Sequence, residues 1–334
     1  MEWLAYSIAG DDHITHLPVA LDGSNSGLQH LSAMLRDERG AQITCVKPGT
    51  TPEDVYQMVA DQVERGLATM DDEWAAIWRG KVTRKVVKQP TMTYTYSATE
   101  SGMRDQIKSA LSGLDCPLEG PYLSFTDKTQ SNASAASFLA PIVRAAIATQ
   151  MQKAAEAMQF LQDIAKTYSK TGLPLRWTTP LGVPVLQYYP TSASKRKSVF
   201  INGSRHWLRI NVDSPDKLNK RRAVSGVSPN FVHSMDSTHL LWTVLYCADN
   251  HDIGSFAMIH DSFGTHATNC DALAAATREM FVTLYSEDRL TDLRNQTAKN
   301  LELVAPELVA ELPDVPEFGT FDINTVRDSD YFFA

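Results

Sequence analysis

The chain has 334 residues, of which 43% are hydrophobic and 21% are charged. This length allows one large core or two domains, and the composition is ordinary for a soluble protein. The N-terminus lacks the basic stretch of a signal peptide, and the longest uncharged segment, 177–194, contains three prolines, which argues against secretion and against a membrane-spanning helix. The four cysteines are scattered without metal-site spacing and indicate reduced thiols of a cytosolic protein.

Charge is distributed unevenly along the chain. The net charge of −8 argues against a nucleic-acid partner, yet residues 79–88 carry five cations and no acid, and residues 195–222 carry nine cations against two acids. The last 35 residues reverse this balance, with eight acids and one base. Because the local field determines where a polyanion binds, the two basic segments keep nucleic acid open as a partner. The alternative interpretation is that both are solvated surface.

The first part of the chain predicts one strand and two helices. Residues 17–22 form a short apolar run that ends in an acid and a glycine-containing turn, which favours a strand with Asp22 at its exit. Residues 26–39 place leucines on one helical face. Residues 51–67 have the start signal of a helix, with Thr51 as the N-cap, a proline at the first position and acids in the first turn.

The middle of the chain predicts helices followed by extended structure. Residues 129–170 are rich in helix formers; Pro141 is expected to begin or kink a helix there, and Gly172 is a plausible C-cap. The prolines and alternating apolar residues of 173–185 favour strands and loops. An apolar stripe in the helical region is interpreted as core rather than as a cofactor slot: Ile142, Ile147, Met151, Ala154, Met158 and Leu161.

Two hairpins are predicted in the second half. Residues 198–212 alternate as strands do, and Asn202-Gly203 is the turn signal between them. Residues 256–266 predict a strand, a tight turn carrying Asp261, and a second strand. Helices dominate elsewhere. The expected fold class is therefore α+β, predominantly helical, with a small sheet built from segments near both ends of the chain.

Asp22 and Asp261 lie 239 positions apart, each after an apolar strand. Either acid alone is more often a turn or cap residue. Two carboxylates on neighbouring strands would repel one another, so a bridging metal becomes the better interpretation of the pair. Gly23 would let a backbone carbonyl approach the ion as a further ligand. Two acids that hold two Mg²⁺ ions are what nucleotidyl transfer requires.

A basic stripe is the third element. Arg84, Lys88, Met92 and Tyr96 are spaced i, i+4, i+8 and i+12, so a helix would align them along one face. Cations near its start and an aromatic ring at its end suit a nucleotide, whose phosphates pair with the cations. The alternative is an exposed amphipathic helix. Pro90 complicates both interpretations, since it should kink or restart the helix.

Two histidines accompany these segments. His233 lies in Pro229-Asn-Phe-Val-His-Ser, and His260 directly precedes Asp261. A single histidine is usually a structural residue, so spacing alone gives neither a role.

Five motifs in order resemble the single-subunit bacteriophage and mitochondrial type of DNA-directed RNA polymerase. The resemblance extends from about residue 17 to the C-terminal Ser-Asp-Tyr-Phe-Phe-Ala. The motifs are Asp22-Gly-Ser-x-Ser-Gly-x-Gln-His30, Arg84-Lys-Val-x-Lys88 with Tyr96, Arg176-Trp-Thr-Thr-Pro180, Pro229-Asn-Phe-Val-His-Ser234 and His260-Asp-Ser-Phe-Gly264. The Asp-Gly-Ser pattern and its Gln-His distinguish the first motif from that of the related DNA polymerases.

This resemblance implies a right-hand polymerase fold, whose palm supplies both metal-binding acids. The palm would contain residues 1–50 and 229–334. The fingers would be an insertion of residues 51–228. The N-terminal domain and the thumb of the family have no counterpart in this chain.

The resemblance also assigns roles around the reacting phosphate. Asp22 and Asp261 would be the ligands of two Mg²⁺ ions, assisted by the carbonyl of Gly23. Arg84 and Lys88 would bind the triphosphate. The expected catalytic residues are thus the two acids, Lys88 and the tyrosine at position 96.

Other residues would surround the incoming nucleotide. Tyr96 is similar to the tyrosine that helps the family choose ribonucleotides, and His233 to the histidine that contacts the ribose side of that site. His260 would support Asp261, and Tyr56 would lie near the nucleotide. The family usually has glycine where Ser97 stands in this chain, a departure that could alter sugar selection or helix movement.

The basic segment 195–222 occupies the place of the family's specificity hairpin, which enters the promoter major groove and would read base edges there. Asn25 replaces a common cysteine of the family and is expected to matter little. The residues expected to contact DNA are Lys195, Arg196, Lys197, Arg205 and Arg209.

Family members are far longer than this chain. We therefore expect a second polymerase subunit carrying the thumb and the N-terminal domain, joined through an interface above about 2,000 Å²; a fragment of a longer chain is the alternative. The other implied partners are template and promoter DNA, ribonucleoside triphosphates and the nascent RNA, with no membrane. A phage-encoded enzyme would act in the cytoplasm of the infected host cell.

Two alternative functions remain open from the sequence. One is a non-catalytic polymerase-like module that only binds DNA or a protein partner. The other is a polymerase that uses deoxyribonucleotides, against which Tyr96 and the Asp-Gly-Ser motif argue.

Overall fold

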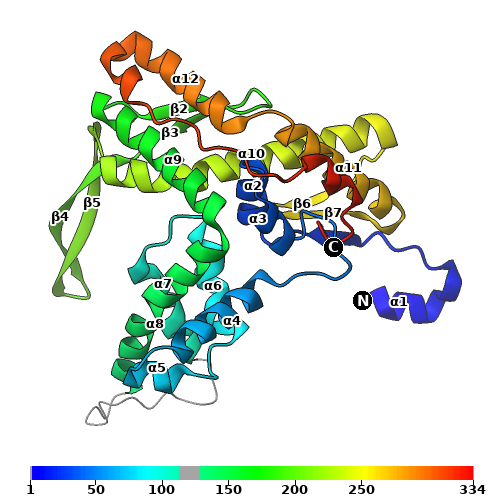
Figure 1. The fold of residues 1–334 in the computed structure, drawn as a ribbon, viewed down its shortest axis with the longest axis horizontal. Helices are drawn as coiled ribbons and strands as arrows, with labels where there is room; N and C mark the ends of the chain where they lie inside the picture. Colours follow the sequence, from blue (N-terminus) through cyan, green and yellow to red (C-terminus); the bar gives the residue numbers. More distant parts are fainter. Residues whose placement is uncertain (1, 113–127, 334) are drawn as a thin grey trace.

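The computed structural model describes residues 2–112 and 128–333 (Figure 1). Its helices are α1 (Glu2–Ala9), α2 (Ser26–Met34), α3 (Glu38–Ile43), α4 (Val55–Ala68), α5 (Glu73–Trp78), α6 (Arg84–Tyr94), α7 (Glu100–Ser112), α8 (Lys128–Gln150), α9 (Gln152–Tyr168), α10 (Lys220–His251), α11 (Cys270–Tyr285) and α12 (Arg289–Val304). Its strands are β1 (Pro18–Asp22), β2 (Leu175–Thr178), β3 (Pro184–Gln187), β4 (Pro190–Ile201), β5 (Ser204–Leu218), β6 (Ala257–Ile259) and β7 (Ser262–His266). The strands form small antiparallel sheets among many helices, which confirms the predicted α+β class. Within these ranges, no helix combines the length and the apolarity needed to cross a lipid bilayer.

The sheet that carries both predicted acids has the strand order β1-β7-β6. Both strand pairs are antiparallel, and Asp22 lies opposite Ser262 in the register of β1 with β7. β6 and β7 form the predicted strand–turn–strand unit, with Asp261 in the turn. The prediction of a small sheet built from both ends of the chain is therefore confirmed.

An aromatic core lies beneath this sheet. The fully buried Phe263 of β7 packs edge to face on Phe333, with ring centroids 5.0 Å apart. Phe332 packs on Phe281 of α11 at 4.7 Å. Phe333 also forms an isolated β-bridge with Gly23. The C-terminal segment thus fastens the turn that follows Asp22 to the core.

The helix predicted for 26–39 is broken in the structure. α2 ends at Met34, and α3 begins after Asp37, whose carboxylate accepts the N–H of Arg39 as an N-cap. Arg36 between them has a positive φ of 54°. Its carbonyl accepts the N–H of Phe321, so a contact with the C-terminal segment replaces the next helical hydrogen bond.

The predicted start of the next helix is wrong by three residues. Asp54, and not Thr51, is the N-cap of α4, because its carboxylate accepts the N–H groups of Tyr56 and Gln57. The helix extends to Ala68, close to the predicted end.

The prolines within helices do not interrupt them. α6 continues through Pro90, and α8 through Pro141. α10 runs as one helix of 32 residues through Pro229, so the predicted palm–fingers boundary falls inside it. Gly172 adopts a left-handed φ of 77° and caps the 3-10 turn that follows α9. The apolar stripe of α8 and α9 is core as predicted, with Ile142 partly buried against it.

The hairpin of β4 and β5 is longer than the predicted 198–212 and projects from the body of the molecule (Figure 1). Asn202 and Gly203 form its turn, with φ values of 48° and 78°. Positive φ at both positions is typical of a type I′ turn, and the sequence predicted a turn at these two residues.

Candidate active site

The two predicted metal ligands are neighbours at one end of the β1-β7-β6 sheet. Asp22 ends β1, and the N–H of Gly23 donates to the carbonyl of Asp261 at 3.1 Å. Asp22 is exposed and Asp261 is half-buried. His260, in the same turn, is exposed and has a φ of 52°. Strand pairing thus places both carboxylates where one cation cluster could contact them.

Electrostatics favours a cation at this sheet end. Burial raises the pKa of Asp261, and the charges of Asp22 and Asp236 raise it further, while His260 lowers it. Carboxylate and carbonyl oxygens are the ligands that Mg²⁺ takes, and it often uses one or two carboxylates together with substrate phosphates. In the part of the chain that the structure describes, no group of three or more His, Cys, Asp or Glu could hold a metal. The donors therefore fit an ion that completes its shell from substrate and water.

Asp236 of α10 is a buried carboxylate that the sequence analysis missed. It accepts hydrogen bonds from the Ser26 hydroxyl at 2.8 Å and from His30 Nε2 at 3.2 Å. Burial alone would raise the pKa of Asp236, but these partners outweigh it and lower the pKa to about 2. His30 Nδ1 in turn contacts the Tyr285 hydroxyl at 2.5 Å. This network ties α2, which follows the Asp22 turn, to α10 and α11.

The basic stripe of α6 converges on Tyr56 of α4. The Arg84 guanidinium lies 5.0 Å and the Lys88 ammonium 5.8 Å from the centroid of its ring. The Tyr56 hydroxyl donates to the carbonyl of Ser24 at 3.3 Å and accepts from Asn25 at 3.3 Å. Tyr56 therefore links the two cations to the turn that follows Asp22.

Asp54 has two tasks at this place. One of its oxygens caps α4, and the other accepts a hydrogen bond from Arg84 at 2.6 Å. The Arg84 and Asp54 side chains are 47% and 41% exposed, so water screens the pair. An ion pair of this kind is weak, and an incoming anion could take over the guanidinium at small cost.

Tyr96 and His233 face each other across the end of α6. Their ring centroids lie 4.8 Å apart. Burial raises the pKa of Tyr96 to about 12, and the charges of Asp236 and Asp261 contribute to the rise. Burial lowers the pKa of His233, against the effect of Asp236. The neutral tyrosine and the neutral imidazole at neutral pH can therefore exchange hydrogen bonds with a polar ligand, within the field of Asp261.

Gly27 permits the close contact between α2 and the end of α6. A Cβ at this position would lie 2.6 Å from Thr95 Oγ1 and 3.4 Å from a ring carbon of Tyr96. The Ser228 hydroxyl of α10 donates to the Thr95 carbonyl at 3.4 Å. The position of Tyr96 thus depends on two neighbouring helices.

The backbone conformation at Ser97 shows why the family usually has glycine at this position. Its N–H donates to the Tyr94 carbonyl at 3.0 Å, and the N–H of Ala98 donates to the Thr93 carbonyl at 3.1 Å. This is the Schellman end of a helix, which needs a left-handed residue. Ser97 has a φ of 60°, a conformation that glycine adopts without strain.

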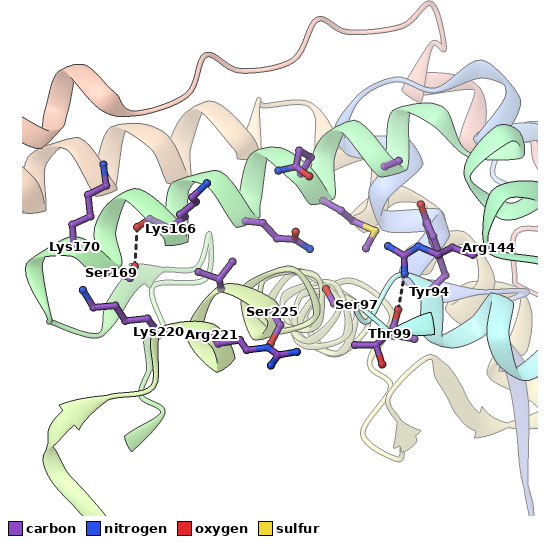
Figure 2. Close-up of a pocket in the computed structure, with 16 residues that line it drawn as sticks. Tyr94, Ser97, Thr99, Arg144, Lys166, Ser169, Lys170, Lys220, Arg221 and Ser225 are labelled. Atoms are coloured by element: carbon purple, nitrogen blue, oxygen red, sulfur yellow. Dashed lines mark hydrogen bonds between the residues drawn. The ribbon is translucent and has the colours of Figure 1, made fainter. Parts of the chain in front are cut away.

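A basic cavity of about 730 Å³ opens beside Ser97 (Figure 2). Its cations come from α8, α9 with the turn after it, and α10: Arg144, Lys166, Lys170, Lys220 and Arg221. Among the described residues that line it, none is acidic. Arg144 donates to the Ala98 carbonyl at 3.2 Å. The walls of this cavity come from separate segments, so no single stretch of the sequence predicts it.

The residues predicted to contact DNA lie apart from this centre. Lys195, Arg196 and Lys197 belong to β4, and Arg205 and Arg209 belong to β5, on the projecting hairpin. All five are exposed. The structure thus brings the predicted metal, phosphate and sugar residues together and separates the hairpin from them.

Most of the sequence matches a known protein family. A model of the DNA-dependent RNA polymerases matches residues 2–308. The chain belongs to this family. It is 36% identical to the human "DNA-directed RNA polymerase, mitochondrial" over 96% of its length. The DNA-directed RNA polymerase of Enterobacteria phage T3 is 33% identical over 95% of the chain, and "DNA-directed RNA polymerase 1, mitochondrial" of Arabidopsis thaliana is 34% identical over 96%.

These relatives are much longer than the chain. It spans 26% of the human protein, 40% of the T3 protein and 32% of the Arabidopsis protein. The matches confirm the predicted phage and mitochondrial type of polymerase.

Proposed function

We propose that this chain carries the nucleotidyl-transfer centre of a DNA-directed RNA polymerase. Its template would be DNA, its substrates ribonucleoside triphosphates and its product RNA. Family membership supports the reaction class. The observation that carries the proposal is the pairing of β1 with β7, since it brings Asp22 and Asp261 to one sheet end. Tyr96 lies within the field of Asp261 there.

Two acids and one carbonyl form the proposed metal site. Asp22, Asp261 and the Gly23 carbonyl would hold two Mg²⁺ ions, which stabilise charge on the attacking and leaving oxygens. The chain's own contribution is to fix the acids before substrate arrives. The β1–β7 register sets their backbones, and the Asp236 network holds the adjacent helices. Such preorganisation avoids rearrangement at the moment of reaction.

The α6 side would bind the triphosphate. Arg84 and Lys88 lie on one face of the helix, over the Tyr56 ring. Arginine pairs with phosphate oxygens through two parallel hydrogen bonds, and lysine acts as a point charge. When a nucleotide binds, Arg84 would exchange Asp54 for the phosphates. The leaving pyrophosphate would remain paired with these cations.

Tyr96 and His233 would meet the sugar. A hydroxyl donor and an imidazole that face each other can bond a ribose hydroxyl. A site built for that bond discriminates against a sugar without the hydroxyl, because its polar groups would lose their partner. Ribonucleotides are thus the proposed substrates.

The proposal is tested by Asp22→Asn and Asp261→Asn, each assayed for extension of an RNA primer on a DNA template by the assembled enzyme. Both variants should lose synthesis and keep folding and DNA binding. Extension at the normal rate by either variant would overturn the metal assignment. Wild-type incorporation of ribonucleotides and deoxyribonucleotides is compared in the same assay. A preference for deoxyribonucleotides would favour a polymerase that uses them. No Mg²⁺-dependent extension with a partner present would favour a non-catalytic binding module.

We also propose that residues 1–50 and 229–334 act as the palm and 51–228 as the fingers, with a second polypeptide supplying the thumb and the N-terminal domain. Exposed apolar side chains on α1 and at the end of β6 support a covering partner: Trp3 is 79%, Ile8 is 80% and Ile259 is 71% exposed. We expect primer extension only when this partner is added to the chain. The phage origin stays a prediction, since the relatives include phage, mitochondrial and chloroplast enzymes.

A further inference from the structure

The β4–β5 hairpin has two chemically different faces. Residues directly opposite each other in an antiparallel pair share a face, and successive residues alternate between faces. In the observed register Arg196 lies opposite Arg209, and Phe200 lies opposite Arg205. All four therefore share one face, together with Trp207, which lies opposite Ser198.

We call this side the arginine face; it consists of Ser192, Ser194, Arg196, Ser198, Phe200, Arg205, Trp207, Arg209, Asn211 and Asp213. Asp213 is the one acid among these ten residues. It lies at the base of the hairpin and accepts a hydrogen bond from the Ser192 hydroxyl at 2.6 Å. Three guanidinium groups thus dominate the part of this face near the tip. That balance suits a polyanion.

Aromatic rings and a guanidinium are layered at the tip of the arginine face. The Arg205 guanidinium lies 5.5 Å from the Phe200 ring centroid and 5.9 Å from the Trp207 ring centroid. Phe200 is 70% and Trp207 is 64% exposed. Neither ring therefore supports the hairpin by packing in a core. Flat, exposed rings with a stacked arginine are the surface on which nucleic-acid bases stack.

The opposite side is an apolar face with two lysines. It carries Ala193, Lys195, Lys197, Val199, Ile201, Ser204, His206, Leu208, Ile210 and Val212. Lys195 and Lys197 therefore point away from the three arginines, although they are adjacent in sequence to Arg196. The five cations predicted to contact DNA are therefore divided between the two faces.

We propose that the arginine face binds an unpaired segment of a nucleic-acid strand, with bases stacked on Trp207 and Phe200 and phosphates held by Arg196 and Arg209. Charge complementarity selects the polyanion. The exposed rings select unpaired bases, because only these offer a free π-face. The inference rests on the proposed polymerase function, which requires opened DNA. Compared with the DNA contacts predicted from the sequence, it adds Phe200 and Trp207 and leaves out Lys195 and Lys197.

The test is a fluorescence-anisotropy titration of the full chain against labelled DNA. One probe is a duplex with a central unpaired bubble, and the other is the fully paired duplex of the same length. Trp207→Ala should weaken binding to the bubble by about 5- to 150-fold, since each stacked base contributes about 1–3 kcal/mol. Binding to the paired duplex should stay unchanged. Trp207→Phe keeps a stacking ring and should restore most of the bubble affinity.

A matched pair of double variants tests the assignment of faces. Arg196→Gln with Arg209→Gln should weaken binding and lower the salt dependence by about one counterion for each lost phosphate contact. Lys195→Gln with Lys197→Gln removes the same amount of charge from the same part of the hairpin, on its other face, and should leave the affinity for the bubble near wild type. Equal losses in both double variants would overturn the assignment.

Three results would contradict the stacking surface. Trp207→Ala could weaken both probes equally, which indicates groove contacts with paired DNA. It could weaken neither, which indicates that Trp207 makes no contact with the DNA. The affinity could also stay low in Trp207→Phe, which indicates a structural role for Trp207. Asp22→Asn should lose synthesis but bind the same probes as the wild type does, which separates this inference from the proposed function. An assembled wild-type enzyme that binds the bubble through Trp207 but never extends a primer would refute only the proposed function.

Discussion

The two sides of the candidate active site are held in different ways. On the sheet side, Asp236 is 6% exposed and accepts hydrogen bonds from Ser26 and His30. On the α6 side, Arg84 is held by a half-exposed ion pair with Asp54. The first arrangement is costly to disturb, because a buried charge that loses its partners is strongly destabilising. The second costs little to rearrange.

This difference fits the tasks proposed for the two sides. Metal-binding acids act best when their positions are fixed before substrate arrives. Cations that bind a triphosphate must accept it and release pyrophosphate in every cycle, so loosely held groups suit them. Gly27 lies at the joint, where α2 touches the end of α6. Substitutions on each side and at the joint can therefore test the contrast.

The largest effect is expected on the sheet side. Asp236→Ala leaves the Ser26 hydroxyl and His30 without their shared acceptor and should destabilise the fold by about 3 kcal/mol or more. Urea unfolding should show a lower midpoint with an unchanged slope. Asp249→Ala, an exposed acid on the same helix, is the control and should change stability by less than about 0.5 kcal/mol. Equal midpoints would contradict the rigid-side interpretation.

The pKa of Asp236 gives this prediction a pH dependence. In the folded state the pKa of Asp236 is lowered from 3.8 to about 2. At pH values above the ordinary pKa, the charged form therefore contributes about 2 kcal/mol to the free energy of unfolding. That contribution is lost as the pH falls through about 2. The deficit of Asp236→Ala should therefore be full near neutral pH and shrink in acid.

The next largest effect is expected from a substitution at the joint between α2 and the end of α6, and it should lower activity. In Gly27→Ala the new Cβ would lie 2.6 Å from Thr95 Oγ1, so the end of α6 and Tyr96 must shift. A misplacement of about 1 Å can cost about 100-fold in rate, which primer extension would measure. Gly66→Ala on α4 has nothing within 4 Å of its Cβ and is the matched control. Adding Thr95→Ala should recover activity; failure to recover would place the defect elsewhere.

Short segments of the sequence predicted the strands and turns that depend only on neighbouring residues. The apolar run before Asp22 predicted β1, and Asn202-Gly203 predicted the hairpin turn. Motif order predicted that the acids would meet, and β1–β7 pairing brings them together. The hairpin faces could have been found too, since alternation from a known turn separates Arg196 from Lys197.

Contacts between distant segments explain what the sequence did not show. Ser26 and Asp236 are 210 positions apart, and nothing near either residue indicates the bond between them. The break after α2 depends on a hydrogen bond from Phe321 to Arg36. The cap at Asp54 was predicted as an ordinary first-turn acid, and its bond to Arg84 spans 30 positions. Such pairs become visible only when the chain is folded.

The smallest effect is expected on the α6 side. Asp54→Asn keeps an N-cap, since asparagine caps helices as well as aspartate does, but it removes the charge that holds Arg84. The freed guanidinium should bind the triphosphate more readily and lower the KM for nucleotides by up to about 5-fold, the equivalent of a surface ion pair. The effect should fade at high salt. Asp72→Asn makes the same cap change on α5, where the carboxylate accepts the N–H groups of Trp74 and Ala75, and should leave the KM unchanged. A KM that rises in Asp54→Asn would mean that Asp54 orients Arg84 for the nucleotide, and the α6 side would then be as preorganised as the sheet side.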